Sequence, residues 1–238
     1  MRKFVLSPKG RRLHRVLGIV FGIYLITAAL SGIAHNVIAL AYPPPPALPP
    51  GDVGLDAAII SPAEAARIAG IGNSVAAVNV QTIGGNVIYQ FLPAAATQPV
   101  YVDAASGALN DNLDARYAAE IARRALPGRR LTNTAYLTAF DDEYTQMHRT
   151  LPVYRFDAEG DDGARVYVST ATGGVTFWTN DARRTLSAIF KNLHMLSFIG
   201  NHPVQMWILI VFAVGATAMA GLGLAMVWAR DNGRRNKA

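Results

Sequence analysis

The chain has 238 residues, of which 51% are hydrophobic and only 16% charged, so it is neither a disordered segment nor an ordinary soluble domain. Its formal net charge of +6 arises at the two ends, because ten of the 22 basic residues lie in Met1–Arg15 and Arg230–Ala238. This distribution is typical of membrane topology and predicts no nucleic-acid partner. The absence of cysteine excludes disulfides, zinc–thiolate sites, iron–sulfur clusters and covalently attached c-type haem.

The first apolar run, residues 16–42, contains no charged residue and exceeds the roughly 20 residues that cross a bilayer core. Only basic charges precede it in residues 1–15, which predicts a cytoplasmic N-terminus. A cleaved signal peptide is the alternative, since Ala39-Leu40-Ala41 fits a small-residue cleavage pattern. The run is much longer than the roughly 7–15 residues of a signal-peptide core, so we expect an uncleaved transmembrane helix.

A second transmembrane helix is predicted over residues 203–229, followed by a basic cytoplasmic tail, residues 230–238. Trp207 and Trp228 near its two ends fit the aromatic belts of membrane interfaces. Small residues recur every four positions in both spans (Ala213, Thr217, Gly221 and Ala225 in the second, Gly18 and Gly22 in the first). Such ladders let helices approach closely in lipid, so they could pair the two spans or build a homodimer.

Two short segments connect these spans to the middle of the chain. Residues 43–51 are rich in proline and predict an extended spacer that lifts the next domain off the membrane. Residues 182–202 begin with an amphipathic pattern through Ile199 and predict an interfacial helix leading into the second span.

The middle of the chain contains an internal repeat. Val100–Gly107 (VYVDAASG) matches Val166–Gly173 (VYVSTATG) 66 residues later, and each copy reads as a strand running into a turn. A helix precedes each copy, and further strands are predicted around them (helices from Ser61 and over Asp114–Leu126; strands near residues 78–82, 87–92, 134–140, 152–157 and 164–169). We therefore predict an α+β class with two similar units, residues 52–112 and 113–181.

At this point the sequence resembles the PepSY domains and the PepSY-associated transmembrane proteins. The resemblance rests on Ser61–Ala66 (SPAEAA), the VYVDxxSG turn, Leu151–Arg155 (LPVYR), Leu13–Gly18 (LHRVLG) and Leu193-His194. It covers nearly the whole chain, which departs from longer members by having two spans instead of four and Ser169 in place of the turn aspartate. The resemblance implies a bacterial inner-membrane protein with both termini in the cytoplasm and a periplasmic tandem PepSY-like domain of duplicated helix plus antiparallel sheet.

The histidines are the sharpest candidates for a binding site. Four of five lie at or near the predicted spans (His14, His35, His194 and His202), where ionisable groups are costly and tend to be functional. Two imidazoles on facing helices are the usual axial ligands of a b-type haem. His35 ends the first span on the outer side, so it could share one haem iron with His194 or with His202. We expect the His35–His194 pair, with Asn36 or Asn201 accepting a hydrogen bond from an imidazole.

His14 lies at the inner end of the first span, where the second span offers no histidine. A haem there would need a second chain or another type of ligand. The alternative is that His14 contacts lipid headgroups and that His202 only caps a helix.

The soluble part contains no recognised catalytic motif. Asp141–Glu143 and Glu159–Asp162 are expected to be solvated turns, with calcium binding as the weaker alternative. His148 is expected to lie in an exposed loop.

Two functions follow as hypotheses. The resemblance implies a haem-binding electron-transfer or ferric-siderophore-reductase-like component linked to iron uptake, with an iron siderophore as a partner. The alternative is a non-enzymatic binding or protease-restraining module that recognises a periplasmic protein. Reduced-minus-oxidised absorption spectra would separate the two.

Overall fold

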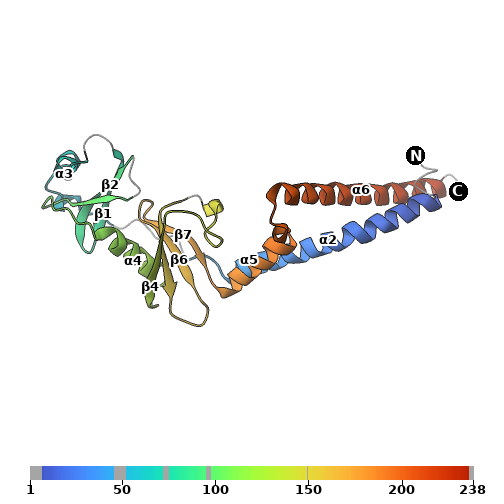
Figure 1. The fold of residues 1–238 in the computed structure, drawn as a ribbon, viewed down its shortest axis with the longest axis horizontal. Coiled ribbons are helices and arrows are strands. Elements are labelled where there is room, and N and C mark those ends of the chain that lie inside the picture. The colour runs from blue at the N-terminus through green and yellow to red at the C-terminus, as the bar shows by residue number, and fades with distance from the viewer. Residues whose placement is uncertain (1–6, 46–51, 72–74, 95–97, 149, 236–238) are drawn as a thin grey trace. The chain divides into compact units, whose positions relative to one another are not determined.

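The computed structural model describes residues 7–45, 52–71, 75–94, 98–148 and 150–235, with side chains up to residue 228 (Figure 1). The chain divides into two compact units, which are Met1–Pro43 with Ala182–Ala238, and Pro44–Asp181. The predicted α+β class is confirmed, because two antiparallel sheets occupy the second unit and two long apolar helices lie near the chain ends. Residues 46–51 of the predicted spacer lie outside the described residues.

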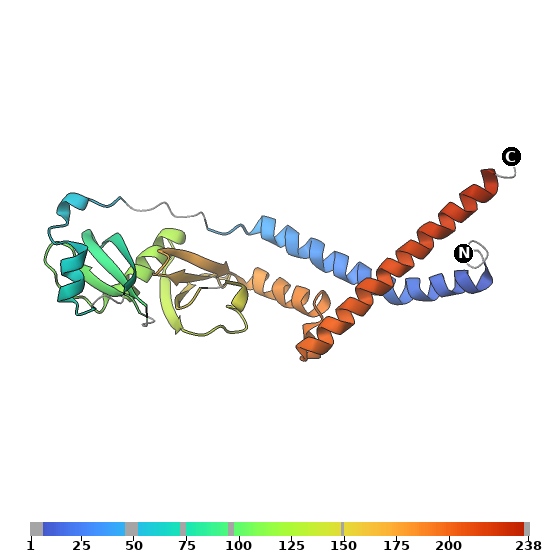
Figure 2. The ribbon, with the colours of Figure 1, turned by 90° about the horizontal axis from the view of Figure 1, so that it is seen from above.

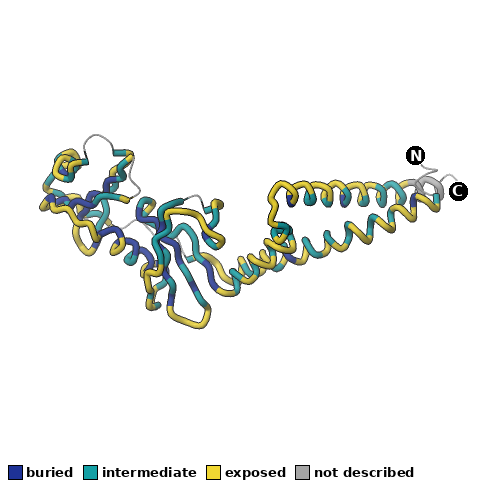
Figure 3. The backbone as a smooth tube through the Cα atoms, in the orientation of Figure 1, coloured by how far each residue is buried: buried dark blue, intermediate teal, exposed yellow. Residues whose placement is uncertain are grey.

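The first unit is built on α2 (Pro8–Ala41) and α6 (His202–Arg235), which lie side by side and cross (Figures 1 and 2). Ser7 caps α2, since its Oγ accepts from Gly10 N at 3.1 Å, and the prolines after Tyr42 cannot extend the helix. Both helices are long and apolar enough to cross a membrane, and most of their surface is exposed (Figure 3). They are therefore compatible with a two-pass membrane protein.

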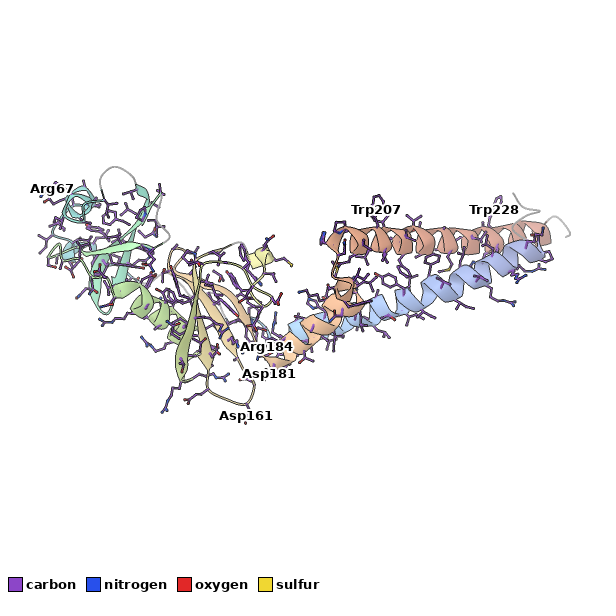
Figure 4. All side chains as sticks on the ribbon, viewed as in Figure 1. Arg67, Asp161, Asp181, Arg184, Trp207 and Trp228 are labelled. Carbon is purple, nitrogen blue, oxygen red and sulfur yellow. The ribbon has the colours of Figure 1, made fainter. Side chains whose placement is uncertain are left out.

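The two tryptophans of α6 lie on the side that faces away from α2 (Figure 4). Trp207 and Trp228 are each 68% exposed. Twenty-one residues of helix separate them, a rise of roughly 32 Å, which is close to the thickness of a bilayer core. This spacing agrees with the predicted aromatic belts.

The residues that bring α2 and α6 together differ from the predicted small-residue ladders. A Cβ added to Gly215 would clash with the ring of Phe21, and one added to Gly223 would lie 3.2 Å from His14 Cε1. By contrast, nothing lies within 4 Å of a Cβ added to Gly18, Gly22 or Gly221. Aromatic side chains of α2 therefore enter recesses at Gly215 and Gly223, and the predicted ladders do not pair the spans within one chain.

The predicted interfacial helix is shorter than expected. α5 (Asp181–Leu193) ends one residue before His194, and a short 3-10 helix η3 (Ser197–Ile199) follows between Leu196 and Gly200, both with positive φ. The next helix is capped by Asn201, whose Oδ1 accepts from Val204 N at 3.1 Å, and not by His202, the cap that the alternative interpretation expected.

In the second unit, residues 52–112 form a first module. It contains η1 (Leu55–Ala57), α3 (Pro62–Ile68) and the sheet β1 (Val75–Ile83), β2 (Asn86–Pro93) and β3 (Val100–Asp103), in the order β1-β2-β3. Ser61 Oγ accepts from Glu64 N at 3.2 Å, which confirms the predicted helix start. Gly84 and Gly85, with φ of +60° and +87°, make the two-residue hairpin turn.

Residues 113–181 form the second module. It contains α4 (Leu113–Ala125), η2 (Gln146–His148) and a four-stranded sheet in sequence order, β4 (Leu131–Leu137), β5 (Val153–Ala158), β6 (Arg165–Ser169) and β7 (Gly174–Thr179). The sequence did not predict β7, and β4 lies three residues earlier than expected. All strand pairs are antiparallel.

The two modules share one plan. Tyr101 of β3 pairs with Gln90 in the middle of β2, and Tyr167 of β6 pairs with Arg155 in the middle of β5. The first module even retains a trace of a fourth strand, because the single bridge Val102↔Leu109 has the seven-residue spacing of Val168↔Val175 in β6 and β7. Tyr101 and Tyr167 thus occupy matching positions, as the repeat predicts.

The largest core cluster lies around α4, which packs between the two sheets (Figure 1). This cluster draws buried side chains from the first sheet, from α4 and from the second sheet (Ile83, Ile88 and Tyr101; Leu113, Tyr117, Ala118, Ile121 and Ala122; Tyr154, Phe156, Val166 and Val168). A smaller cluster under α3 fills the first module. The single helix α4 therefore contributes core side chains to both sheets.

Candidate functional site

The histidine at the end of α5 is held against α2. His194 Nδ1 lies 3.1 Å from the carbonyl oxygen of Ala28 and 3.4 Å from Ser31 Oγ. A carbonyl oxygen only accepts, so Nδ1 carries a proton, and Nε2 is the ring atom left to act as a ligand. Tyr24 Oη donates to the His194 carbonyl at 3.0 Å, which also fixes the backbone here. The sequence pointed instead to Asn36 or Asn201 as the acceptor.

Those two asparagines have other partners. Asn36 Nδ2 donates to the Gly32 carbonyl at 2.9 Å, and Asn201 caps α6. A second polar contact fixes the turn after His194, because Gln205 Nε2 donates to the Met195 carbonyl at 2.5 Å. No sequence pattern indicates a main-chain acceptor two helical turns before His35, which explains why this contact was missed.

The structure brings His35 and His194 to one aromatic side chain. The ring of Phe190 stacks on His194 with centroids 4.5 Å apart and lies 4.8 Å from the ring of His35. A haem ligated by both imidazoles would need the space that this ring occupies. The donor chemistry of His194 fits a haem, and the space fits only if the Phe190 side chain turns aside.

The other two predicted ligands lie elsewhere. His14 faces Gly223 of α6, and its Nδ1 is buried without a hydrogen-bond partner in the described structure. His202 is the exposed first residue of α6. Neither residue contacts the Phe190 cluster, so the geometry favours His35 and His194 among the predicted set.

A buried carboxylate links the two modules of the second unit, and no sequence pattern indicates it. Asp114, in the first turn of α4 and only 7% exposed, accepts from Tyr101 Oη at 2.5 Å and from Tyr154 Oη at 2.8 Å. Burial and the neighbouring carboxylate raise the pKa of both phenols well above their usual range. The helix N-terminus also favours a negative charge at this position.

The same network continues into the first sheet through a buried glutamine. Gln90 Nε2 donates to Tyr101 Oη and to the Thr170 carbonyl, each at 2.9 Å. Asn79 Nδ2 donates to Gln90 Oε1 at 2.9 Å and lies 3.4 Å from the Ala171 carbonyl. The turn of the second repeat is thus bound by side chains of the first module. These hydrogen bonds connect the two modules through buried side chains.

The other face of the second sheet is covered by the loop that contains η2. Tyr144 is fully buried and donates to the Thr150 carbonyl at 2.8 Å, and the His148 ring lies 4.0 Å from that of Phe177. The prediction that His148 lies in an exposed loop is wrong, because aromatic packing half-buries it. Burial lowers the pKa of His148.

The acidic clusters are used structurally. Asp141 Oδ1 accepts from two backbone N–H groups. Glu143 Oε2 accepts a hydrogen bond from Arg165 Nη1 at 2.6 Å, which makes an ion pair. Asp162 pairs with Arg129 at 2.7 Å, which holds the pKa of Asp162 below its usual range. Across the described ranges, no group of three or more histidine and acidic residues could hold a metal ion.

Comparisons with protein-family models, with curated proteins and with solved structures each gave no match. The resemblance to PepSY-associated transmembrane proteins therefore stays a prediction. What the site offers is an imidazole whose Nδ1 is held by a main-chain carbonyl and a second imidazole on the same aromatic ring, where α5 meets α2.

Proposed function

We propose that this chain is a two-pass inner-membrane protein that binds a b-type haem through His35 and His194 and transfers electrons. The observation that carries the proposal is the hydrogen bond from His194 Nδ1 to the Ala28 carbonyl, because it leaves Nε2 free as a ligand. The bound haem would supply one-electron chemistry. A ferric siderophore as the electron acceptor follows only from the family resemblance.

The protein's own residues would orient the group. Ala28 and Ser31 fix the ring of His194, and Tyr24 fixes its backbone. His35 is exposed, so its side chain has room to rotate toward the haem when the Phe190 ring turns aside.

Reduced-minus-oxidised spectra of the chain purified from membranes test this proposal. We expect a b-type α-band in the natural protein and its loss in both His35→Ala and His194→Ala. His148→Ala is the matched control and should keep the full band. Phe190→Ala should also keep it, since that change removes the ring that competes for the space.

Three outcomes would contradict the proposal. A colourless preparation that stays colourless when haem is added would end it. A full band in His35→Ala would exclude His35 as a ligand. Loss of the band in His202→Ala, with retention in His194→Ala, would transfer the role to His202.

A non-enzymatic binding module is the second candidate, and the construction of the second unit favours it. The buried side chains of Gln90, Tyr101, Tyr154 and Asp114 hydrogen-bond to one another and join the two modules. Such a rigid tandem is suited to presenting a surface to a periplasmic protein. A haem-free preparation that still captures such a protein would favour this function.

A further inference from the structure

The first sheet has an open edge at β1. Its strand order is β1-β2-β3, so β1 pairs only with β2. Ile83 and Asn86 flank the two-residue turn and form a hydrogen-bonded pair, and this pattern alternates along the strands. The backbone groups of Val78, Val80 and Thr82 must therefore point away from β2.

An independent contact confirms this alternation. Val87 is opposite Thr82, and its carbonyl accepts from Ala104 N at 2.9 Å on the far side of β2. Among the described residues, no backbone hydrogen bond connects Val78 or Val80 with a segment outside the sheet. At the Thr82 end of β1, Thr82 Oγ1 donates to the Asp52 carbonyl at 2.9 Å, and the Asn79 side chain lies 3.4 Å from the Ala171 carbonyl.

This edge lacks the usual protection against pairing. The strand (VAAVNVQTI) contains no charge and no proline, and Val78 is 43% exposed. A bulge interrupts its start, but Ala77–Ile83 is regular. The outer strand of the other sheet, β4, is different, because a bulge interrupts its middle and Arg129-Arg130 precede it.

We infer that β1 pairs antiparallel with β1 of a second copy of this chain, joining two three-stranded sheets into one. A two-fold axis at Val80 would pair all seven residues of Ala77–Ile83 and set the outward groups of Val78 against those of Thr82. An uncharged strand meets its own copy without like charges. The neighbouring spacer is a poor competitor, because proline lacks the N–H that a strand must donate.

Anchoring in one membrane, which the proposed topology supplies, would raise the effective concentration of two copies. The inference does not depend on haem. It also does not use the glycines of the spans, so a dimer formed through the membrane helices is a distinguishable alternative.

Cross-linking of the full chain in lipid nanodiscs tests the pairing. The protein contains no cysteine, so Val80→Cys creates a single thiol at the proposed axis. We expect oxidation to yield a covalent dimer with Val80→Cys. The control is Ile59→Cys, at a position of 78% exposure away from the edge, which should cross-link less despite its greater accessibility.

Particle mass gives a second measurement. The natural chain should have the mass of a dimer, Val78→Lys the mass of a single chain, and Ile59→Lys the mass of a dimer. Circular dichroism should show that Val78→Lys remains folded. A monomeric natural chain would overturn the inference, as would a dimer that survives Val78→Lys and shows no cross-link at residue 80.

Discussion

The same turn follows β3 and β6, yet the two copies are stabilised differently. In the first copy, Asp103 Oδ1 accepts from Ala105 N, Ser106 N and Ser106 Oγ at 2.8–3.0 Å, so an exposed turn is fixed by its own aspartate. In the second copy, Ser169 is only 1% exposed, and its hydroxyl has no hydrogen-bond partner in the structure. There the turn is fixed from outside, by Gln90 and Asn79 of the first module.

This difference explains why the repeat motif changes from aspartate to serine. A carboxylate at position 169 would be buried, because this position is only 1% exposed, and burying a charge is costly. The duplicated turn has therefore become part of the contact between the modules. The covering of the sheets diverged in the same way, since α4 covers the open face of the first and the loop with Tyr144 covers that of the second.

The largest effect is expected when position 169 of the second turn is given the aspartate of the first turn. Ser169→Asp should lower the free energy of unfolding by about 3 kcal/mol, because it places a charge at a fully buried position. The measurement is urea unfolding of the full chain, followed by near-ultraviolet circular dichroism of the tyrosines. Ser169→Ala should be nearly neutral, since the hydroxyl has no partner. Equal losses in the two variants would contradict a charge-burial effect.

The buried carboxylate gives the next largest effect. Asp114→Ala leaves the hydroxyls of Tyr101 and Tyr154 without their acceptor and should cost about 2 kcal/mol of unfolding free energy. The same urea experiment measures it. Asp111→Ala, at an exposed position three residues earlier, is the control and should change stability little. If both variants unfold at the same urea concentration, the network does not stabilise the contact.

The exposed turn should be less sensitive, with a distinctive pH dependence. Asp103→Ser should cost about 1 kcal/mol at pH 7, because the turn loses its acceptor. Backbone and side-chain hydrogen bonds from Ser106 hold the pKa of Asp103 below its usual value. The stabilisation is therefore present above the unfolded pKa and is lost as the pH falls through the folded one. Unfolding at pH 7 and below about pH 4 would show whether the difference disappears.

The smallest expected effect concerns the loop over the second sheet. Burial lowers the pKa of His148, so the unfolded chain binds its proton more readily than the folded one. Stability should therefore decline as the pH falls from about 6.5 toward the folded pKa. His148→Phe should remove this decline and preserve the packing on Phe177. Thermal unfolding between pH 7.5 and 5.5 measures it, and a parallel decline in both proteins would assign the effect to another group.

Local patterns predicted the regular elements well. The charge-free runs indicated α2 and α6, and Ser61 indicated the start of α3, because spans and caps depend on neighbouring residues. β7 was missed because Gly174–Thr179 has no clear alternation, and its strand state comes from pairing with β6. The interfacial helix was predicted too long because the periodicity continues past Leu193, although Leu196 adopts a left-handed conformation.

The candidate sites could likewise be predicted only where individual residues carry the signal. The sequence pointed to His35 and His194, and the structure places both beside Phe190. It could not indicate the acceptor of His194, which is a main-chain carbonyl and carries no residue-specific signal. Nor could it indicate the environment of Asp114, because Tyr101 and Tyr154 are distant in sequence and meet only when both sheets have packed on α4.

The position of α4 has a consequence for folding cooperativity. The first sheet turns Ile88 and Tyr101 toward a helix that belongs to the second module, so a chain ending at Asn112 would expose both side chains together with the buried amide of Gln90. Neither copy can complete its core alone, although each has its own helix and sheet. Residues 52–181 should therefore unfold in a single transition.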